Sequence, residues 1–238
     1  METTERYSVI ATDISKRYSE NKGIGPVSVQ FETGNIYAII GSNGCGKTTL
    51  IRCLCRLEEV QTGFIKYNAP ESTKNLLFST VFQTPEPWTH LNVFDNIALP
   101  LKKVLNMSDC EAKQWAEEVL MEFGLSDRLK SFSNQLSGGL RQRVVQARTF
   151  AMQPTFLYLD EPTSALDPEW SDSFGKIVRK YANSGKMVLV VAHQMNFLKK
   201  IADKVFYLNN GFIIEEGTPD QIFNHPKDES LIRFIENA

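Results

Sequence analysis

Residues 41–48 have the types and spacing of a phosphate-binding loop. They match G-x-x-x-x-G-K-[ST] at every fixed position, with Lys47 and Thr48 at the end. In such a loop, glycines let backbone N–H groups surround the α- and β-phosphates. The lysine reaches the β- and γ-phosphates, and the hydroxyl binds Mg²⁺. An apolar strand-like run at 36–40 precedes the loop and an apolar helical stretch follows to about 57. This context argues against a glycine-rich turn with a solvated lysine.

A pair of adjacent carboxylates follows a second apolar run, at 156–159. Asp160 stands at the carboxyl end of this expected strand, where it can hold Mg²⁺ through water. The next side chain, Glu161, points in another direction and can polarise the water that attacks a γ-phosphate. The alternative, a carboxylate that only caps a helix, is weakened by the presence of the phosphate loop.

Two further polar residues stand at strand ends. Gln83 ends an apolar-flanked run, and His193 follows the apolar run 187–192. Each alone has an ordinary explanation, as a polar strand end or an isolated histidine. In an α/β sheet, however, ligands bind beyond the carboxyl ends of the strands. Thr48, Gln83, Asp160 and His193 are therefore expected to converge on one site.

Residues 136–140 form a second element that suits an anion. Ser137, Gly138 and Gly139 open an expected helix that runs to about residue 151, so they offer a hydroxyl and free backbone N–H groups. The chain already has a complete phosphate loop. Two phosphate-binding elements for a single nucleotide therefore raise the question of how both could reach it.

Composition and charge indicate a protein without a membrane span of its own. The 238 residues can bury a sizeable core, and 26 basic against 28 acidic residues leave a net charge of −2. No strong positive field points to nucleic acid as a partner. The longest apolar runs are far shorter than the roughly 20 residues that span a bilayer, and no secretory signal is apparent. Four cysteines without a framework spacing favour reduced thiols.

Periodicity predicts an α/β core interrupted by helices. Ser108 begins a capping box ahead of an amphipathic helix that ends at Gly124, and Asp167 caps another helix. We place the α/β core at about 1–83 and 155–238, and a helical insert at about 84–154. Strands are expected at 9–14, 27–31, 36–40, 156–159, 187–192, 205–208 and 212–214.

These motifs, in this order, resemble the ATP-binding cassette (ABC) ATPases, the nucleotide-binding subunits of membrane transporters. The resemblance covers essentially the whole chain and implies a single nucleotide-binding domain that hydrolyses ATP with Mg²⁺. Its fold would be α/β, a P-loop NTPase (RecA-like) core with an N-terminal antiparallel β portion and an inserted helical subdomain. The matching motifs are the phosphate loop at 41–49, a Q-loop at Gln83, a signature at 136–140, a magnesium strand at 156–161, a D-loop at 164–167 and a switch at His193.

The resemblance assigns a role to each matching residue. Glu161 is the expected catalytic base, His193 the γ-phosphate contact, and Tyr18 the ring that stacks on adenine. Thr48 and Gln83 are expected to contact Mg²⁺, with Asp160 behind them. The expected phosphate-binding loop consists of Gly41, Ser42, Asn43, Gly44, Cys45, Gly46, Lys47, Thr48 and Thr49, with Lys47 also counted as catalytic.

The same resemblance assigns the signature to a nucleotide that is bound by a second copy of the chain. Ser137, Gly138 and Gly139 are expected to grip the γ-phosphate of ATP bound to a second copy of the chain, and Asp167 to help position that copy's site. A head-to-tail dimer formed with ATP is therefore implied. Transmembrane permease subunits and, at the level of the complex, an extracytoplasmic solute-binding protein are implied as well. The chain would be a peripheral subunit at the cytoplasmic face of the membrane.

The chain departs from the family pattern at two places. Leu140 stands where the signature usually has Gln, which puts any polar contact of that side chain in doubt. Pro85 and Pro87 follow the Q-loop where amino-acid importers have none or one. This stretch lies beside the groove that receives the transporter's coupling helix, so partner specificity is expected to be unusual.

Several local stretches resemble the polar amino-acid uptake branch, among them 88–93, 193–203 and 217–223. They favour an importer, with an exporter-type or lipid-related cassette as the alternative. A non-transport ABC ATPase is a further alternative, but the chain has a single cassette and no heptad run. A nucleotide-binding scaffold without hydrolysis is disfavoured because Glu161 and His193 are both present.

Overall fold

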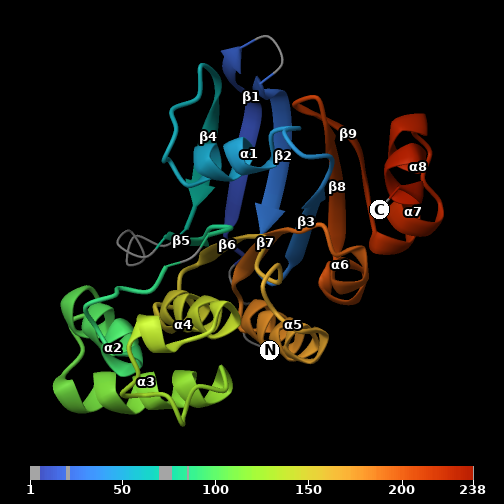
Figure 1. Ribbon diagram of the computed structural model, residues 1–238. Coiled ribbons are helices and arrows are strands. Elements are labelled where there is room, and N and C mark those ends of the chain that lie inside the picture. Colours follow the sequence, from blue (N-terminus) through green and yellow to red (C-terminus); the bar gives the residue numbers. More distant parts are fainter. Residues whose placement is uncertain (1–5, 20–21, 70–76, 85, 238) are drawn as a thin grey trace, which may run out of the picture.

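A computed structural model of the chain describes residues 6–19, 22–69, 77–84 and 86–237, and the statements below concern these residues. Pro85, one of the two prolines noted after the Q-loop, lies outside them. Two sheets and a layer of helices make up the fold (Figure 1). The smaller sheet is antiparallel, in the order β2-β1-β4, and α1 (Lys47–Leu54) packs against it. Its strands are β1 (Ser8–Ser19), β2 (Lys22–Glu32) and β4 (Thr62–Asn68).

The larger sheet has six strands in the order β5-β6-β7-β3-β8-β9. All neighbouring pairs are parallel except β8 with β9. The register places Leu159 opposite both Val81 and Val190, and Val191 opposite Ile39, so four strands end at nearly the same level. The strands are β3 (Ile36–Ile40), β5 (Phe78–Val81), β6 (Phe156–Asp160), β7 (Met187–Val191), β8 (Lys204–Asn209) and β9 (Phe212–Gly217).

The central strands are apolar along their whole length because both faces of the sheet are covered. Every residue of β3, β6 and β7 is buried. Side chains alternate between the two faces. Ile36 and Ala38 pack into the cluster shared with the helices, whereas Tyr37 and Ile39 pack into the cluster shared with the small sheet and α1.

The remaining elements are helical, and α2, α3 and α4 form a layer beyond the large sheet, away from the small one (Figure 1). Ser108 caps α3 as predicted, with Glu111 N donating to its Oγ at 3.3 Å and Ser108 N donating to the Glu111 carboxylate at 2.9 Å. Gly124 follows α3 with φ +63°, a conformation that suits glycine. The helices are α2 (Val93–Lys103), α3 (Asp109–Glu122), a 3₁₀ turn (Ser133–Gln135), α4 (Gly138–Ala151), α5 (Pro168–Asn183), α6 (Met195–Ile201), α7 (Pro219–Asn224) and α8 (Glu229–Glu236).

Three features of the elements were not predicted from the sequence. Pro100 lies inside α2, where Val104 N still donates to its carbonyl at 2.8 Å. It sits in the last turn, so few intrahelical bonds are lost. The helix expected to about 57 ends at Leu54. The strand β4 was missed because most of its residues are exposed, which leaves no clear apolar pattern.

An aromatic cluster joins the helical layer to α5. The Phe150 ring on α4 lies 5.3 Å from that of Phe123, 5.9 Å from that of Phe174 and 4.9 Å from that of Tyr181, measured between centroids. All four residues are buried. Edge-to-face contacts of this kind add to the energy of burial. The cluster therefore fixes α4 against the helix that follows the D-loop.

Replacing Phe150 tests this packing. Phe150→Ala should lower the free energy of unfolding by about 3–5 kcal/mol, because it leaves a cavity between α3, α4 and α5. Urea unfolding followed by circular dichroism measures the change. Met121→Ala is the matched surface control, because Met121 is 68% exposed on α3. An effect of Phe150→Ala no larger than that of the control would contradict the packing described.

Candidate nucleotide site

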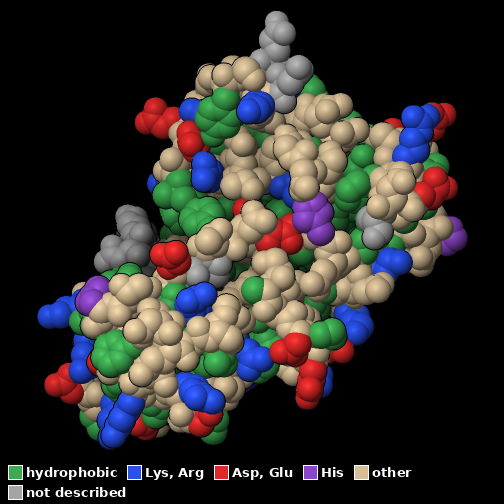
Figure 2. All heavy atoms as spheres, viewed as in Figure 1, with side chains coloured by type: hydrophobic (Ala, Val, Ile, Leu, Met, Phe, Trp, Pro, Cys, Tyr) green, Lys and Arg blue, Asp and Glu red, His purple; other side chains and the backbone are tan. Residues whose placement is uncertain are grey.

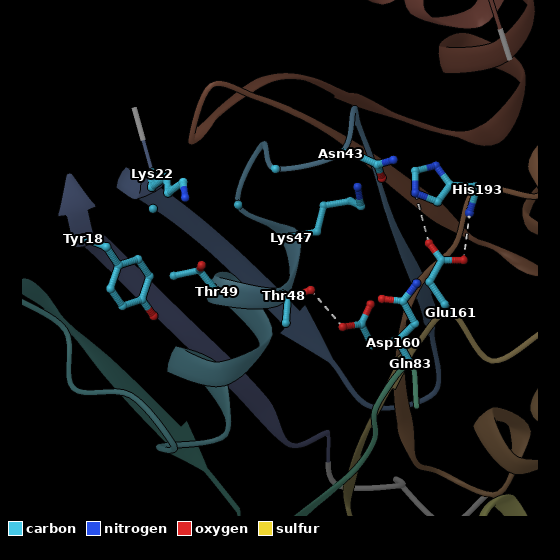
Figure 3. A pocket seen from close by; sticks show the side chains of 13 residues that line it. Tyr18, Lys22, Asn43, Lys47, Thr48, Thr49, Gln83, Asp160, Glu161 and His193 are labelled. Atoms are coloured by element: carbon cyan, nitrogen blue, oxygen red, sulfur yellow. Dashed lines mark hydrogen bonds and ion pairs between the residues drawn. The ribbon is translucent and has the colours of Figure 1, made fainter. Parts of the chain in front are cut away.

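A cavity of about 380 Å³ opens where the carboxyl ends of β3, β5, β6 and β7 meet. Side chains from both sheets and from the loops after the strands point into it (Figure 3). Seen from outside, acidic and histidine side chains meet near the centre of this face, while Lys and Arg are scattered around it (Figure 2). Its lining is Tyr18, Lys22, Gly23, Asn43, Gly44, Gly46, Lys47, Thr48, Thr49, Gln83, Asp160, Glu161 and His193.

The loop between β3 and α1 presents its backbone to this cavity. Gly44 has φ +79° and nothing lies within 4 Å of where its Cβ would be, so the chain faces open space there. Gly46, with φ +114°, precedes α1 and provides no side-chain cap for it. The first N–H groups of α1 are therefore free to bind an anion, and the helix dipole favours negative charge at the same point.

Lys47 lies folded along this loop. Its Nζ donates to the carbonyls of Gly41 at 2.8 Å and Ser42 at 3.0 Å. Both acceptors are neutral, so the positive charge of the ammonium remains available to phosphate. Gly41, Ser42 and Cys45 were also predicted to bind nucleotide, but they do not line this cavity. Cys45 is buried behind the loop, where its N–H donates to the Ser42 carbonyl at 3.3 Å.

A hydroxyl and a carboxylate meet at the base of the cavity. Thr48 Oγ1 donates to Asp160 Oδ2 at 2.9 Å (Figure 3). Burial raises the pKa of Asp160, and the bond from Thr48 and the charge of Lys47 oppose that rise. Oxygen donors of this kind suit Mg²⁺, which usually takes few protein ligands and completes its shell with phosphates and water. No group of three or more His, Cys, Asp or Glu able to hold a metal occurs among the described residues.

Glu161 and His193 face each other at the other side of the cavity. His193 Nε2 lies 3.3 Å from Glu161 Oε1, and the His193 backbone N–H donates to Oε2 at 3.3 Å. The Glu161 residue is buried, whereas the His193 side chain is 46% exposed. Burial raises the pKa of Glu161, and the neighbouring His193 opposes the rise. A carboxylate with a raised pKa accepts a proton more readily near neutral pH.

Tyr18 stands at the open end of the cavity and is 51% exposed. Lys16 Nζ lies 5.7 Å from its ring centroid, and the same ammonium pairs with Glu58 at 3.3 Å. The pKa of Tyr18 is raised, by burial first and then by its hydrogen bond to Glu58. An exposed ring supported in this way can receive a flat base. Lys22 lines the same end, and the sequence patterns did not single it out.

The signature and the D-loop aspartate lie outside the cavity. Ser137 and Gly138 are exposed, and Ser137 Oγ caps α4 by accepting from Leu140 N at 3.3 Å. Asp167 caps α5, accepting from Trp170 N at 2.7 Å, and lies 3.5 Å from the Arg143 guanidinium. None of these residues lines the cavity that Lys47 lines. Leu140 packs against the main core.

Two buried glutamines of α4 also reach the site, and the sequence analysis missed them. Gln142 Nε2 lies 3.3 Å from the Glu161 carbonyl and 2.8 Å from the Pro162 carbonyl. Gln146 Nε2 donates to the same Pro162 carbonyl at 2.7 Å. Their spacing of four residues, which places both on one face of α4 together with buried apolar residues, was the available signal.

Comparisons with known proteins agree with this geometry. The profile of the family described as ABC transporter matches residues 24–164. The histidine/lysine/arginine/ornithine transport ATP-binding protein HisP of Escherichia coli (strain K12) is 36% identical, over 95% of this chain and 96% of that protein. The glutamine transport ATP-binding protein GlnQ of Geobacillus stearothermophilus is 35% identical, over 93% and 95%.

A solved structure extends the comparison. A dimeric ATP-binding cassette in a post-hydrolysis state, bound to ADP and Pi, superimposes with a TM-score of 0.80 and 26% identity, over 89% of this chain and 98% of that one. The family match, the full-length relatives and the shared fold lead to one conclusion: this chain is a member of the ABC transporter family, as an ATP-binding subunit with ATPase chemistry.

Proposed function

We propose that this chain is the Mg²⁺-dependent ATP-hydrolysing subunit of a transporter that imports polar amino acids. The observation that carries the hydrolytic part is the buried Glu161 carboxylate, held against His193 across the cavity from the Lys47 loop. A binding-only protein has no need of a desolvated carboxylate beside the terminal phosphate. A general base does, because proton transfer is fastest when its pKa lies near the working pH.

Each end of the cavity suits a different part of the nucleotide. Tyr18 suits adenine at the open end, and the loop at Gly44 and Gly46 with Lys47 suits the phosphates. Thr48, Asp160 and Gln83 would hold Mg²⁺, which neutralises charge that develops on the phosphates. Glu161 takes the proton of the attacking water, and His193 steadies the γ-phosphate. Catalysis by these groups is mainly positioning and electrostatic stabilisation.

The exposed signature supports the second part of the proposal, a head-to-tail dimer. Ser137 and Gly138 present a helix N-terminus to solvent, outside their own chain's cavity. A second copy can receive it over the nucleotide, with Asp167 beside it. The dimeric cassette among the similar structures has this family's fold. ATP would then lie between two chains, so that binding of ATP drives dimerisation.

The proposed transport role rests on the names of the similar proteins. The similar proteins are named for transport of histidine, lysine, arginine, ornithine and glutamine. No helix among the described residues is long and apolar enough to cross a membrane. Transmembrane permease subunits would therefore carry the substrate, with a solute-binding protein on the outer side. The chain would work at the cytoplasmic face, and its partners would select the amino acid.

Isolation of the membrane partner tests the transport role. The tagged chain is purified from detergent-solubilised membranes of its own source, and proteins that co-purify are identified. A permease whose reconstituted vesicles take up a polar amino acid only with ATP and this chain supports the proposal. A partner that moves lipid, or that exports, would contradict the assignment to import while leaving the ATPase intact.

The base is tested by Glu161→Gln, which keeps size and hydrogen bonding but cannot accept a proton. The steady-state ATPase rate should fall roughly a hundredfold to ten-thousandfold, because a general base contributes about that factor. The same variant should form a stable dimer with ATP, measured by light scattering after size exclusion. A near-normal rate would refute Glu161 as base, and a strictly monomeric elution with ATP would refute the dimer.

The metal site is tested by Asp160→Asn, which keeps an oxygen near Thr48 but removes the charge. The Mg²⁺ concentration that gives half-maximal ATPase rate should rise at least tenfold, since a carboxylate is the stronger ligand for this hard cation. Asp172→Asn on α5 is the matched control, because Asp172 is exposed and pairs with Lys200 at 2.7 Å. An unchanged Mg²⁺ requirement in Asp160→Asn would remove Asp160 from the metal site.

A further inference from the structure

Glu161 holds an unusual backbone conformation. Its φ is +52°, in the left-handed region that residues other than glycine rarely adopt. Such a conformation persists only where surrounding contacts determine it. One contact comes from the sheet, since Glu161 N donates to the Val191 carbonyl at 2.7 Å. The His193 N–H holds the carboxylate directly, and the contacts on the carbonyl side hold the backbone that presents it.

The carbonyl side is held by Ser164 and by α4. The Glu161 carbonyl accepts from Ser164 Oγ at 3.1 Å, from Ser164 N at 3.3 Å and from Gln142 Nε2 at 3.3 Å. The Pro162 carbonyl accepts from Gln142 at 2.8 Å and from Gln146 at 2.7 Å. Two consecutive peptide units are thus fixed from one helix. We call Gln142 and Gln146, with these bonds, the glutamine clamp.

The clamp is made of groups that an apolar core would not otherwise contain. Gln142 is 2% exposed and Gln146 is 0% exposed. Carbonyl oxygens only accept, so each amide must turn its nitrogen toward them. The Oε1 atoms are then left without a hydrogen-bond partner among the described residues. A buried acceptor without a donor is unfavourable. An apolar side chain of equal size would avoid that cost, so we attribute the amides to the bonds that they donate.

We propose that Gln142 and Gln146 are positioning residues that hold the backbone of Glu161 so that its carboxylate faces the terminal phosphate. This inference rests on the proposed function of Glu161 as general base. α4 would then have two roles, because the helix that positions Glu161 also begins with the signature at Ser137. The segment that would grip ATP in a second copy is thereby joined rigidly to the base of its own chain.

Isosteric variants test the clamp. Gln142→Met and Gln146→Met keep side-chain length but donate nothing. The turnover number of the double variant should fall roughly tenfold to hundredfold, as expected when a reacting group is misplaced by about an ångström. The KM for ATP should stay within twofold, because neither residue lines the cavity. Rates are expressed per nucleotide site, titrated with a fluorescent ATP analogue, so that unfolded protein is not counted.

Thr149→Val is the matched control. Thr149 is buried on the same helix, and its hydroxyl donates at 2.8 Å to Val145 O, within α4 itself. Its turnover per site should equal that of the wild type. An equal fall in Thr149→Val and in the methionine variants would show a general effect of perturbing the helix, and would overturn the clamp.

A double-mutant cycle separates positioning from structure. In the Glu161→Gln background the methionine variants should cause no further loss of residual hydrolysis of radiolabelled ATP, because the base is already absent. Losses that multiply would overturn the proposal, as would methionine variants with normal turnover. If Glu161→Gln alone keeps normal turnover, the assignment of the base fails instead, and the two failures are distinguished.

Discussion

Parallel pairing of β3, β6 and β7 is the constraint on which the site depends. The register of these strands is set by apolar side chains buried on both faces of the sheet. A shift by one residue would turn each side chain into the other of the two buried clusters, whose close packing it would not fit, so packing specifies the register. It brings the loop at Gly41, the carboxylates Asp160 and Glu161, and His193 to the same edge. The positions of the candidate site residues therefore follow from where these strands end.

Different neighbours give the two adjacent carboxylates, Asp160 and Glu161, separate properties. The pKa of each is raised by desolvation, but different neighbours oppose the rise: first Thr48 for Asp160 and first His193 for Glu161. Two buried carboxylates in sequence are unfavourable without cations nearby. Lys47 reduces that cost for both, and a bound Mg²⁺ would reduce it further. The cation of the proposed metal–nucleotide complex would compensate the charge of the carboxylates.

The sequence was sufficient to predict a site residue where the local chemistry requires that residue type. The phosphate loop, the acidic pair and the strand-end histidine could be placed because glycine, lysine and carboxylate patterns of this kind have few other uses. The apolar strands, the caps at Ser108 and Asp167, and the helix expected after Ser137 also matched the structure. The family and fold expected from these motifs are confirmed by the comparisons.

Other features depend on tertiary contacts that no local pattern reports. The strand β4 is half polar because only one face is covered, and α2 continues through Pro100 because neighbouring helices hold it. Lys22 reaches the cavity from the first residue of β2, and Gln142 meets Pro162 only once α4 packs against the large sheet. The roles of the site residues, and the boundaries of the helical insert, stay predictions.

The central claim is that the catalytic site is divided between two chains, because the signature lies outside the cavity that holds Lys47. Mixing two inactive variants tests it directly. Lys47→Ala damages only the phosphate loop and Ser137→Arg only the signature, so a mixed head-to-tail dimer contains one undamaged composite site. ATPase activity should be absent from either variant alone and should return when they are mixed. A mixture as inactive as its components would contradict the division of the site between chains.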